Sequence, residues 1–200
     1  MKYDYIAIEC ECGSGGQQIA RMLSEEIGIP CYGKEILETA AEMQGLTIQQ
    51  VMQAAENDTE DVLYSLCMIG QAIHASPGEM PGKAGLFAAI RQTVCGFASD
   101  GPAVFIGHCA GSVLRDLGRV LHVFITSDQA AKVKYIAEQQ RISEQEALAV
   151  AKRHDRRQAA YYRIDTGKRW TDLENYDLVL DSSELGHQGC VGQLTAVLCD

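Results

Sequence analysis

A run of small residues, Gly13-Ser14-Gly15-Gly16, follows a short apolar segment and precedes a helical pattern of apolar residues. In such a loop the backbone N–H groups converge, and the N-terminus of the next helix adds partial positive charge, so that the loop can hold a phosphate group. A plain tight turn between a strand and a helix is the alternative. We favour phosphate binding, and the residues predicted to take part are Gly13, Ser14, Gly15, Gly16 and Gln17.

A second group of residues suited to phosphate chemistry is basic and lies late in the chain. Arg153, Arg156 and Arg157 recur at helical i, i+3 and i+4 spacing, which places them on one side of a helix. Guanidinium groups make charge-assisted, often bidentate contacts with phosphate oxygens. Together with Arg163, this local excess of positive charge is notable in a chain with a net charge of -10. A solvated helix with surface salt bridges is the alternative for any single arginine.

Cysteine and histidine residues follow two of the predicted strands, at Cys10, Cys12, His108 and Cys109. Soft thiolates and an imidazole can form a tetrahedral zinc site. Two residues of a Cys-x-Cys pair on a regular strand seldom both reach one metal, however, so packing is the favoured role. We predict no metal bound by these residues and keep a cysteine-ligated metal or redox protein as a minor alternative.

Four short apolar segments with turn residues at their flanks have the pattern of buried strands. They cover residues 5–10, 103–107, 120–126 and 176–180. Helical patterns separate them, so we predict a parallel sheet with helices on both faces. In such a sheet the ligand binds outside the carboxyl ends of the strands.

The helical segments have recognisable starts. Residues 34–99 are almost entirely helical in pattern, with about four helices, a capping box at Thr47 and a loop over residues 76–82. Later in the chain, Asp128 caps a helix that runs to about Gln140. The remaining predicted helices begin with the capping box at Ser143, reaching at least Tyr162, and at about Gly189.

Composition limits the class of protein. A chain of 200 residues with 46% hydrophobic content is enough for one domain with a sizeable core. The net charge of -10 argues against broad binding to nucleic acid or to an anionic membrane. With no apolar run of membrane-spanning length and no signal-peptide pattern, we expect a soluble cytoplasmic protein whose eight cysteines are mostly reduced.

Taken together, the sequence resembles the cytidylate kinase-like family, whose members pair an early glycine loop with a late segment rich in arginine and tyrosine. The resemblance covers nearly all of the chain. Its four blocks occur in the family's order, and they are residues 11–16, residues 106–110, residues 155–163 with 166–170, and residues 175–178.

The resemblance implies a P-loop kinase-like three-layer α/β sandwich in one domain, residues 1–200. It implies a helical insertion at 34–99 that closes over a nucleoside monophosphate, and an arginine-rich lid at 143–172. The implied activity is phosphoryl transfer from ATP with Mg²⁺, most simply to CMP or dCMP, and homo-oligomerisation is left open. Arg156, Arg157 and Arg163 would stabilise the transferring group. The residues proposed to contact the substrate are His108, Arg153 and Asp177, with capping of a turn as the alternative for the aspartate.

The chain lacks several of the positively charged residues that the family's pattern has near the phosphate-binding loop. The Walker A motif needs a lysine directly after its second conserved glycine, and here Gln17 follows Gly16. Relatives often carry arginine where this chain has Cys10, Gln17 and His108. Since phosphoryl transfer depends on positioning and charge neutralisation, we expect slow turnover. A non-catalytic nucleotide-binding or regulatory protein is the alternative.

Overall fold

The computed structural model describes residues 2–43, 45 and 83–199. In this part of the chain, five parallel strands form one sheet in the order β2-β3-β1-β4-β5. The strands are β1 (Tyr5–Cys10), β2 (Cys31–Tyr32), β3 (Ala103–Ile106), β4 (Val120–Thr126) and β5 (Leu178–Asp181).

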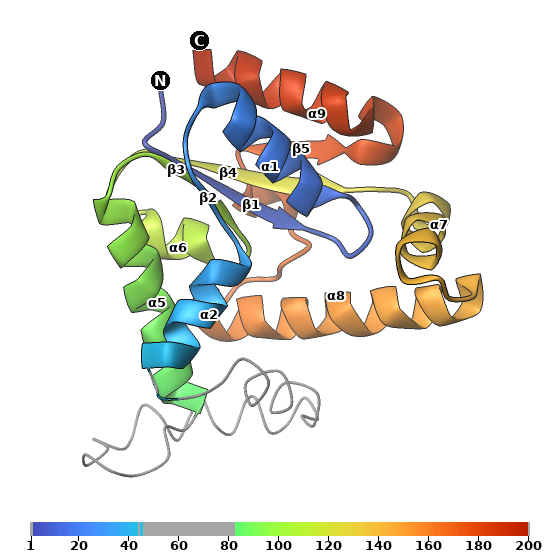
Figure 1. Cartoon of the computed structure of the whole chain (residues 1–200), viewed down its shortest axis with the longest axis horizontal. Helices are drawn as coiled ribbons and strands as arrows, with labels where there is room; N and C mark the ends of the chain where they lie inside the picture. Colours follow the sequence, from blue (N-terminus) through green and yellow to red (C-terminus); the bar gives the residue numbers. More distant parts are fainter. Residues whose placement is uncertain (1, 44, 46–82, 200) are drawn as a thin grey trace.

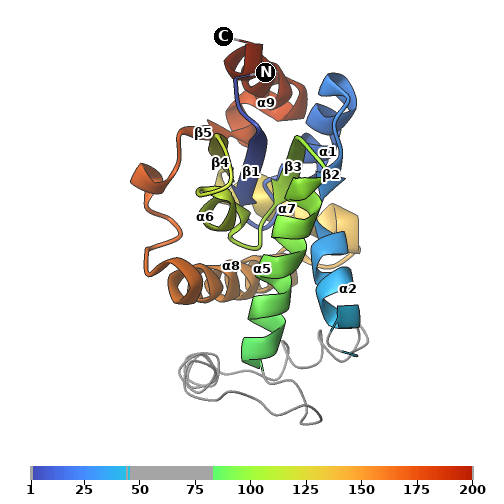
Figure 2. The ribbon, with the colours of Figure 1, turned by 90° about the vertical axis from the view of Figure 1, so that its left-hand side faces the viewer.

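Helices cover both faces of the sheet (Figure 1), as the sequence predicts. One face packs against α1 (Gly16–Ile27) and α9 (Ser182–Cys199), whereas the other packs against α2 (Lys34–Met43), α5 (Lys83–Ser99) and α6 (Ala110–Leu114). Figure 2 shows α8 (Glu144–Thr166) on the same side of the sheet as α5 and α6. In Figure 1, α7 (Gln129–Gln140) lies beyond the carboxyl ends of the strands. The short 3₁₀ helix η1 (Leu173–Asn175) follows α8 in the chain.

The central strand β1 shows why the strands are so apolar. Ile6 and Ile8 are buried among residues of α1 and α9, whereas Ala7 is buried on the opposite face against α5 and α6. Because successive side chains alternate between two covered faces, neither face needs polar residues. Glu9, on the same face as Ala7, is a buried exception.

Local signals in the sequence place most element boundaries. Strand β1 and strand β4 have the predicted bounds, and the Asp128 carboxylate accepts hydrogen bonds from two N–H groups at the start of α7. Ser143 and Glu146 form the predicted capping box of α8. The last helix begins at Ser182, earlier than predicted, and Gly186 interrupts its helical geometry. Strand β2 and helix α6 were missed because they are too short to show a period.

Only part of the predicted helical insertion at 34–99 lies within the described residues. The described residues of that region form α2 and α5, which pack against each other and against the sheet. The capping box predicted at Thr47, the loop predicted at residues 76–82 and Cys67 lie outside the described residues. Within the described residues, none of the helices is long and apolar enough to cross a membrane.

Candidate phosphate-binding site

The glycine loop connects the carboxyl end of β1 to the first turn of α1, where α7 packs against it. Gly13 and Gly15 have φ angles of 86° and 74°, in the left-handed region that favours glycine. A Cβ atom at Gly13 would lie 2.7 Å from the carbonyl oxygen of Lys132 in α7. A Cβ atom at Gly15 would collide with the imidazole of His187. The loop therefore needs glycine both for its conformation and for the close approach of its neighbours.

Several N–H groups of the loop form no hydrogen bond with other described residues. The Ser14 N–H donates to the Glu11 carbonyl oxygen (3.1 Å), and the Cys12 N–H donates to Asp155 Oδ1 (2.8 Å). Within the described part of the chain, no hydrogen bond occupies the N–H groups of four other residues, Gly13, Gly15, Gly16 and Gln17. These donors lie at the N-terminus of a 12-residue helix, which adds positive potential. The loop can therefore hold an anion by its backbone.

Ser14 contributes to the loop in a different way from the sequence prediction. Its side chain is buried, and its Oγ donates to the Glu11 carbonyl oxygen (2.8 Å). Its own carbonyl oxygen accepts a hydrogen bond from Ser182 Oγ (2.7 Å) at the start of α9. These bonds stabilise the turn and leave no role on the surface for the Ser14 hydroxyl in this conformation.

Glu11 fixes the loop to two neighbouring elements. Its Oε2 atom accepts hydrogen bonds from Thr126 Oγ1 (2.6 Å) and from Lys132 Nζ (3.0 Å). The side chains of Glu11 and Lys132 are 18% and 13% exposed, so their ion pair is partly shielded from solvent. The lysine thus neutralises a carboxylate inside the loop, and the sequence analysis did not identify either residue.

This ion pair gives a stability prediction. Replacing Lys132 by Met should lower the free energy of unfolding by about 1–3 kcal/mol, because the half-buried Glu11 carboxylate loses a charged donor. Replacing Lys134, an exposed lysine of the same helix, by Met should change it by less than about 0.5 kcal/mol. Urea unfolding of both variants measures the difference. Equal stability of the two variants would show that the ion pair does not hold the loop.

Glu9 links the glycine-loop strand to α8 and its C-terminal extension. One carboxylate oxygen accepts from the Cys109 N–H (3.2 Å). The other accepts from Gln158 Nε2 and from Trp170 Nε1, both at 3.0 Å. Burial raises the pKa of the Glu9 carboxyl, and the hydrogen bonds from Trp170, Gln158 and Cys109 oppose this shift. In the sequence, the signal for this buried residue is a single glutamate near the end of an apolar strand.

His108 lies in a strained turn after β3. Gly107, His108 and Cys109 all have left-handed φ angles, of 68°, 56° and 53°. Such conformations in residues other than glycine cluster at functional sites. The Gly107 N–H donates to the Ile8 carbonyl oxygen (2.9 Å), so the turn lies beside the glycine-loop strand. Burial lowers the pKa of His108 to about 4, so the imidazole is neutral near pH 7 and supplies no positive charge there.

The predicted arginines lie on the long helix α8. Two residues of α8 form hydrogen bonds with this region: Asp155 accepts from the Cys12 N–H, and Gln158 donates to the Glu9 carboxylate. Because each residue turns the helix by about 100°, Arg156 and Arg157 lie about 100° and 200° around the helix from Asp155. Arg153, Arg156 and Arg163 are exposed, and Arg157 is half-buried. The structure thus brings a carboxylate and an amide of α8 to the loop and to the end of β1.

The aromatic residues beside these arginines pack the region together. Tyr162 and Trp170 are buried with Phe124 and Cys109, and the rings of Phe124 and Trp170 meet edge to face. Tyr161 stacks on Phe87 of α5, with ring centroids 4.8 Å apart. These contacts give the aromatic residues a role in packing α8 and the segment after it against the sheet and α5.

Asp177 lies at the other end of the sheet. Its Oδ2 atom accepts a hydrogen bond from the backbone N–H of His122 (2.9 Å), near the amino end of β4. The glycine loop lies at the carboxyl ends of the strands, so the structure does not bring Asp177 together with Gly13 and Gln17. In this conformation its carboxylate joins the segment before β5 to β4.

Cys10, Cys12 and Cys109 lie in environments that favour the neutral thiol. Burial raises the pKa of Cys10 to about 12 and that of Cys12 to about 11. Burial also raises the pKa of Cys109 far above its usual range. A cysteine binds a metal ion as its thiolate, so a raised pKa disfavours metal binding. Among the described residues, no group of three or more histidine, cysteine, aspartate or glutamate side chains is arranged to hold a metal ion.

Comparison with known proteins agrees with this geometry. The model of the cytidylate kinase-like family matches residues 5–184. The chain is 25% identical over 199 residues to a cytidylate kinase from Methanothrix thermoacetophila, and the match covers 96% of both chains. Among solved structures, a protein from Eubacterium ventriosum has a TM-score of 0.74 at 21% identity, covering 98% of this chain and 99% of that one.

Kinases of small molecules share the fold at lower similarity. The shikimate kinase from Bacteroides thetaiotaomicron has a TM-score of 0.57 at 12% identity, and the match covers 98% of both chains. The predicted P-loop kinase-like α/β fold is therefore confirmed.

Proposed function

Because the chain belongs to the cytidylate kinase-like family, we propose that it transfers a phosphoryl group from ATP to a nucleoside monophosphate. CMP and dCMP are the proposed acceptors, and the similarity to a cytidylate kinase supports this choice. The observation that carries the proposal is a set of four backbone N–H groups at the start of α1, from Gly13, Gly15, Gly16 and Gln17, that have no hydrogen-bond partner among the described residues.

In the proposed reaction these N–H groups hold the phosphates of ATP. Phosphoryl transfer needs positioning and charge neutralisation more than covalent chemistry, so no general base is required. Arg156, Arg157 and Arg163 are proposed to neutralise the transferring group. Asp155 of the same helix accepts from the Cys12 N–H, which places α8 beside the loop.

The donor set near the loop suits Mg²⁺ in part. Mg²⁺ is usually held by one or two carboxylates, water and substrate phosphates. Gln18 stands where the Walker A motif has serine or threonine, but Asp155 brings a carboxylate to the Cys12 N–H of the loop. We propose that Asp155 is the residue that holds Mg²⁺. The bound ion would offset phosphate charge.

The proposed acceptor site lies beside the glycine loop, at the carboxyl ends of β1 and β3. His108 follows β3, and α2 and α5 are the described parts of the predicted insertion. A neutral imidazole can donate one hydrogen bond and accept another, which suits a hydroxyl or a base edge better than a phosphate. Arg153 is exposed on α8 and is proposed to contact the substrate when the lid closes.

A second candidate function is nucleotide binding without catalysis. The Asp155 carboxylate lies at the glycine loop, and Gln17 stands at the position of the Walker A lysine. Negative charge beside the phosphates opposes a transition state that needs charge neutralisation. In this case the protein would bind ATP but would not release ADP with any monophosphate.

A charge change at one residue of the loop tests the proposal. Gln17→Glu should weaken ATP binding at least tenfold, because it places a carboxylate beside one of the free N–H groups. Gln18→Glu, the same change one residue later on the exposed start of α1, should change the affinity less than threefold. Isothermal titration calorimetry with ATP and Mg²⁺ measures both, and thermal melts check the fold.

The activity itself is measured by ADP release over a panel of nucleoside monophosphates. Faster ADP release with CMP or dCMP than with the other monophosphates supports both the proposed kinase activity and the proposed acceptor. ATP binding that Gln17→Glu abolishes, combined with no turnover on any acceptor, supports the non-catalytic alternative. If wild type binds no ATP, both functions are wrong and only the fold remains.

A further inference from the structure

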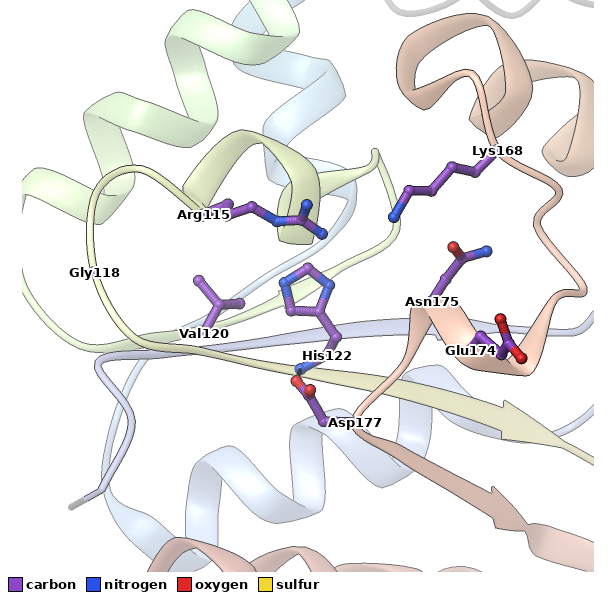
Figure 3. Close-up of a pocket in the computed structure, with 8 residues that line it drawn as sticks. All are labelled: Arg115, Gly118, Val120, His122, Lys168, Glu174, Asn175 and Asp177. Atoms are coloured by element: carbon purple, nitrogen blue, oxygen red, sulfur yellow. Dashed lines mark hydrogen bonds between the residues drawn. The ribbon is translucent and has the colours of Figure 1, made fainter.

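A pocket of about 300 Å³ lies on the α6 side of the sheet, away from the glycine loop (Figure 3). Its lining comes from four parts of the chain: the end of α6, strand β4, the segment after α8, and the segment around η1. The polar residues that line it are Arg115, His122, Lys168, Glu174, Asn175 and Asp177. We call it the Arg115–Lys168 pocket.

Three basic side chains converge in this pocket. Figure 3 shows the guanidinium of Arg115, the ammonium of Lys168 and the imidazole of His122 pointing toward one another. Among the residues that the structure describes, neither Arg115 nor Lys168 has an ion pair or a side-chain hydrogen bond. Two unpaired cations brought together repel each other unless an anion lies between them.

The carboxylates of the pocket do not neutralise these cations. Asp177 accepts a hydrogen bond from the backbone N–H of His122 (2.9 Å), and Figure 3 places its carboxylate below the imidazole, on the side away from Arg115 and Lys168. The Glu174 carboxylate points away from the three basic groups in the same view. The space between the cations is therefore left for a ligand.

The electrostatics of His122 agree with this arrangement. Burial lowers the pKa of the His122 imidazole, and the positive charges of Arg115 and Lys168 lower it further, while Asp177 opposes them. The ring is thus held neutral beside two cations, and a neutral imidazole still has one N–H to donate.

The Arg115–Lys168 pocket is separate from the candidate kinase site. His122 is paired with Ala7 in the sheet, three residues before Cys10, where β1 ends. At about 3.3 Å per residue, the pocket starts about 10 Å before the glycine loop along the strands. One phosphate group cannot occupy both places.

We propose that the Arg115–Lys168 pocket is a second binding site, for a phosphate-bearing anion. Arg115 makes the bidentate contact that its planar guanidinium favours, Lys168 supplies a second positive charge, and His122 donates one hydrogen bond. The phosphate can come from inorganic phosphate or from a nucleotide. The site does not depend on the proposed kinase activity.

The test maps binding by NMR in the full-length protein. Inorganic phosphate, CMP and ATP are titrated separately, and backbone amide shifts are followed at Arg115, His122 and Lys168 and at Gly13 to Gln17. Shifts at the first three residues support the second site. A response to inorganic phosphate as strong as that to the nucleotides assigns phosphate alone, whereas a response to nucleotides only assigns a nucleotide.

Charge-neutralising variants identify the ligands of the phosphate. Arg115→Gln with Lys168→Gln should weaken binding at this site at least tenfold. The control, Lys134→Gln with Lys152→Gln, removes the same charge from exposed positions on α7 and α8 and should leave it unchanged. Gln17→Glu should also leave it unchanged, which separates this site from the glycine loop. Equal loss in both double variants, or no shift at Arg115, His122 and Lys168 with any anion, overturns the proposal.

Discussion

Replacing Glu9 by Ala is expected to lower the free energy of unfolding by about 3 kcal/mol or more. The change removes the acceptor of three donors, the Cys109 N–H, Gln158 Nε2 and Trp170 Nε1. Each buried donor left without a partner costs about 1–3 kcal/mol, and relief of the buried carboxylate's desolvation offsets part of that loss. Glu25→Ala, at an exposed position on α1, is the control and should change stability by less than about 0.5 kcal/mol.

The pH dependence of stability gives an independent measure of the same residue. Burial raises the pKa of Glu9 in the folded state above the ordinary value of 4.5. The folded state therefore keeps its proton to a higher pH than the unfolded state does. The stability that this proton contributes is fully present below pH 4.5 and is lost as the pH rises through the folded-state pKa. The variant Glu9→Gln has no titrating group at this position, so its free energy of unfolding should not show this loss with rising pH.

Chemical denaturation at several pH values measures both effects. As the pH rises from 4.5, the free energy of unfolding of wild type should fall relative to that of Glu9→Gln. A difference that is independent of pH would show that Glu9 titrates as it does in the unfolded chain. Trp170→Phe, which removes one donor, should cost less than Glu9→Ala, and the double variant should show strong non-additivity.

The elements that the sequence predicts well are those set by local chemistry. An apolar run bounded by polar residues places β1, and a carboxylate that accepts its neighbours' N–H groups places the start of α7 at Asp128. The Ser143 capping box is equally local. The loop glycines Gly13, Gly15 and Gly16 could be singled out for the same reason, since a glycine-rich run between a strand and a helix is visible without the fold.

The contacts that complete the site join residues distant in sequence, and no local signal reveals them. Glu9 meets Trp170, Glu11 meets Lys132, and Cys12 meets Asp155. Each pair depends on how α7 and α8 return to the carboxyl end of β1. The sequence shows a helix at 143–162 but does not show where it docks.

The rotation of α8 illustrates the same limit. The spacing of Arg153, Arg156 and Arg157 shows that they share one side of the helix, but not which way that side faces. The rotation is set instead by Ala147 and Ala151, which are buried against Ile136 of α7. Small residues allow the two helices to approach closely, and in this docking the Asp155 carboxylate meets the Cys12 N–H of the loop.

The largest expected effect on activity comes from restoring a cation to the glycine loop. Gln17→Arg should raise kcat/KM for phosphorylation of CMP by about tenfold or more, because a charge-assisted contact with phosphate is worth about 1.5–3 kcal/mol and 1.36 kcal/mol corresponds to a factor of ten. Gln17 is exposed at the start of α1, so the longer side chain needs no repacking. His108 is a poorer place for the same change because it is half-buried in a left-handed turn.

The control places the same charge one residue further along. Gln18→Arg is also exposed, but its side chain leaves the helix about 100° away from that of Gln17, so it should change kcat/KM less than threefold. ADP release is measured for wild type and both variants with each monophosphate. An increase specific to Gln17→Arg shows that a cation missing from the loop limits phosphoryl transfer. Equal increases would instead reflect general attraction of the nucleotide by added positive charge. With ATP bound and no turnover in any of the three proteins, the missing cation is not what prevents catalysis, and the non-catalytic function is the better account.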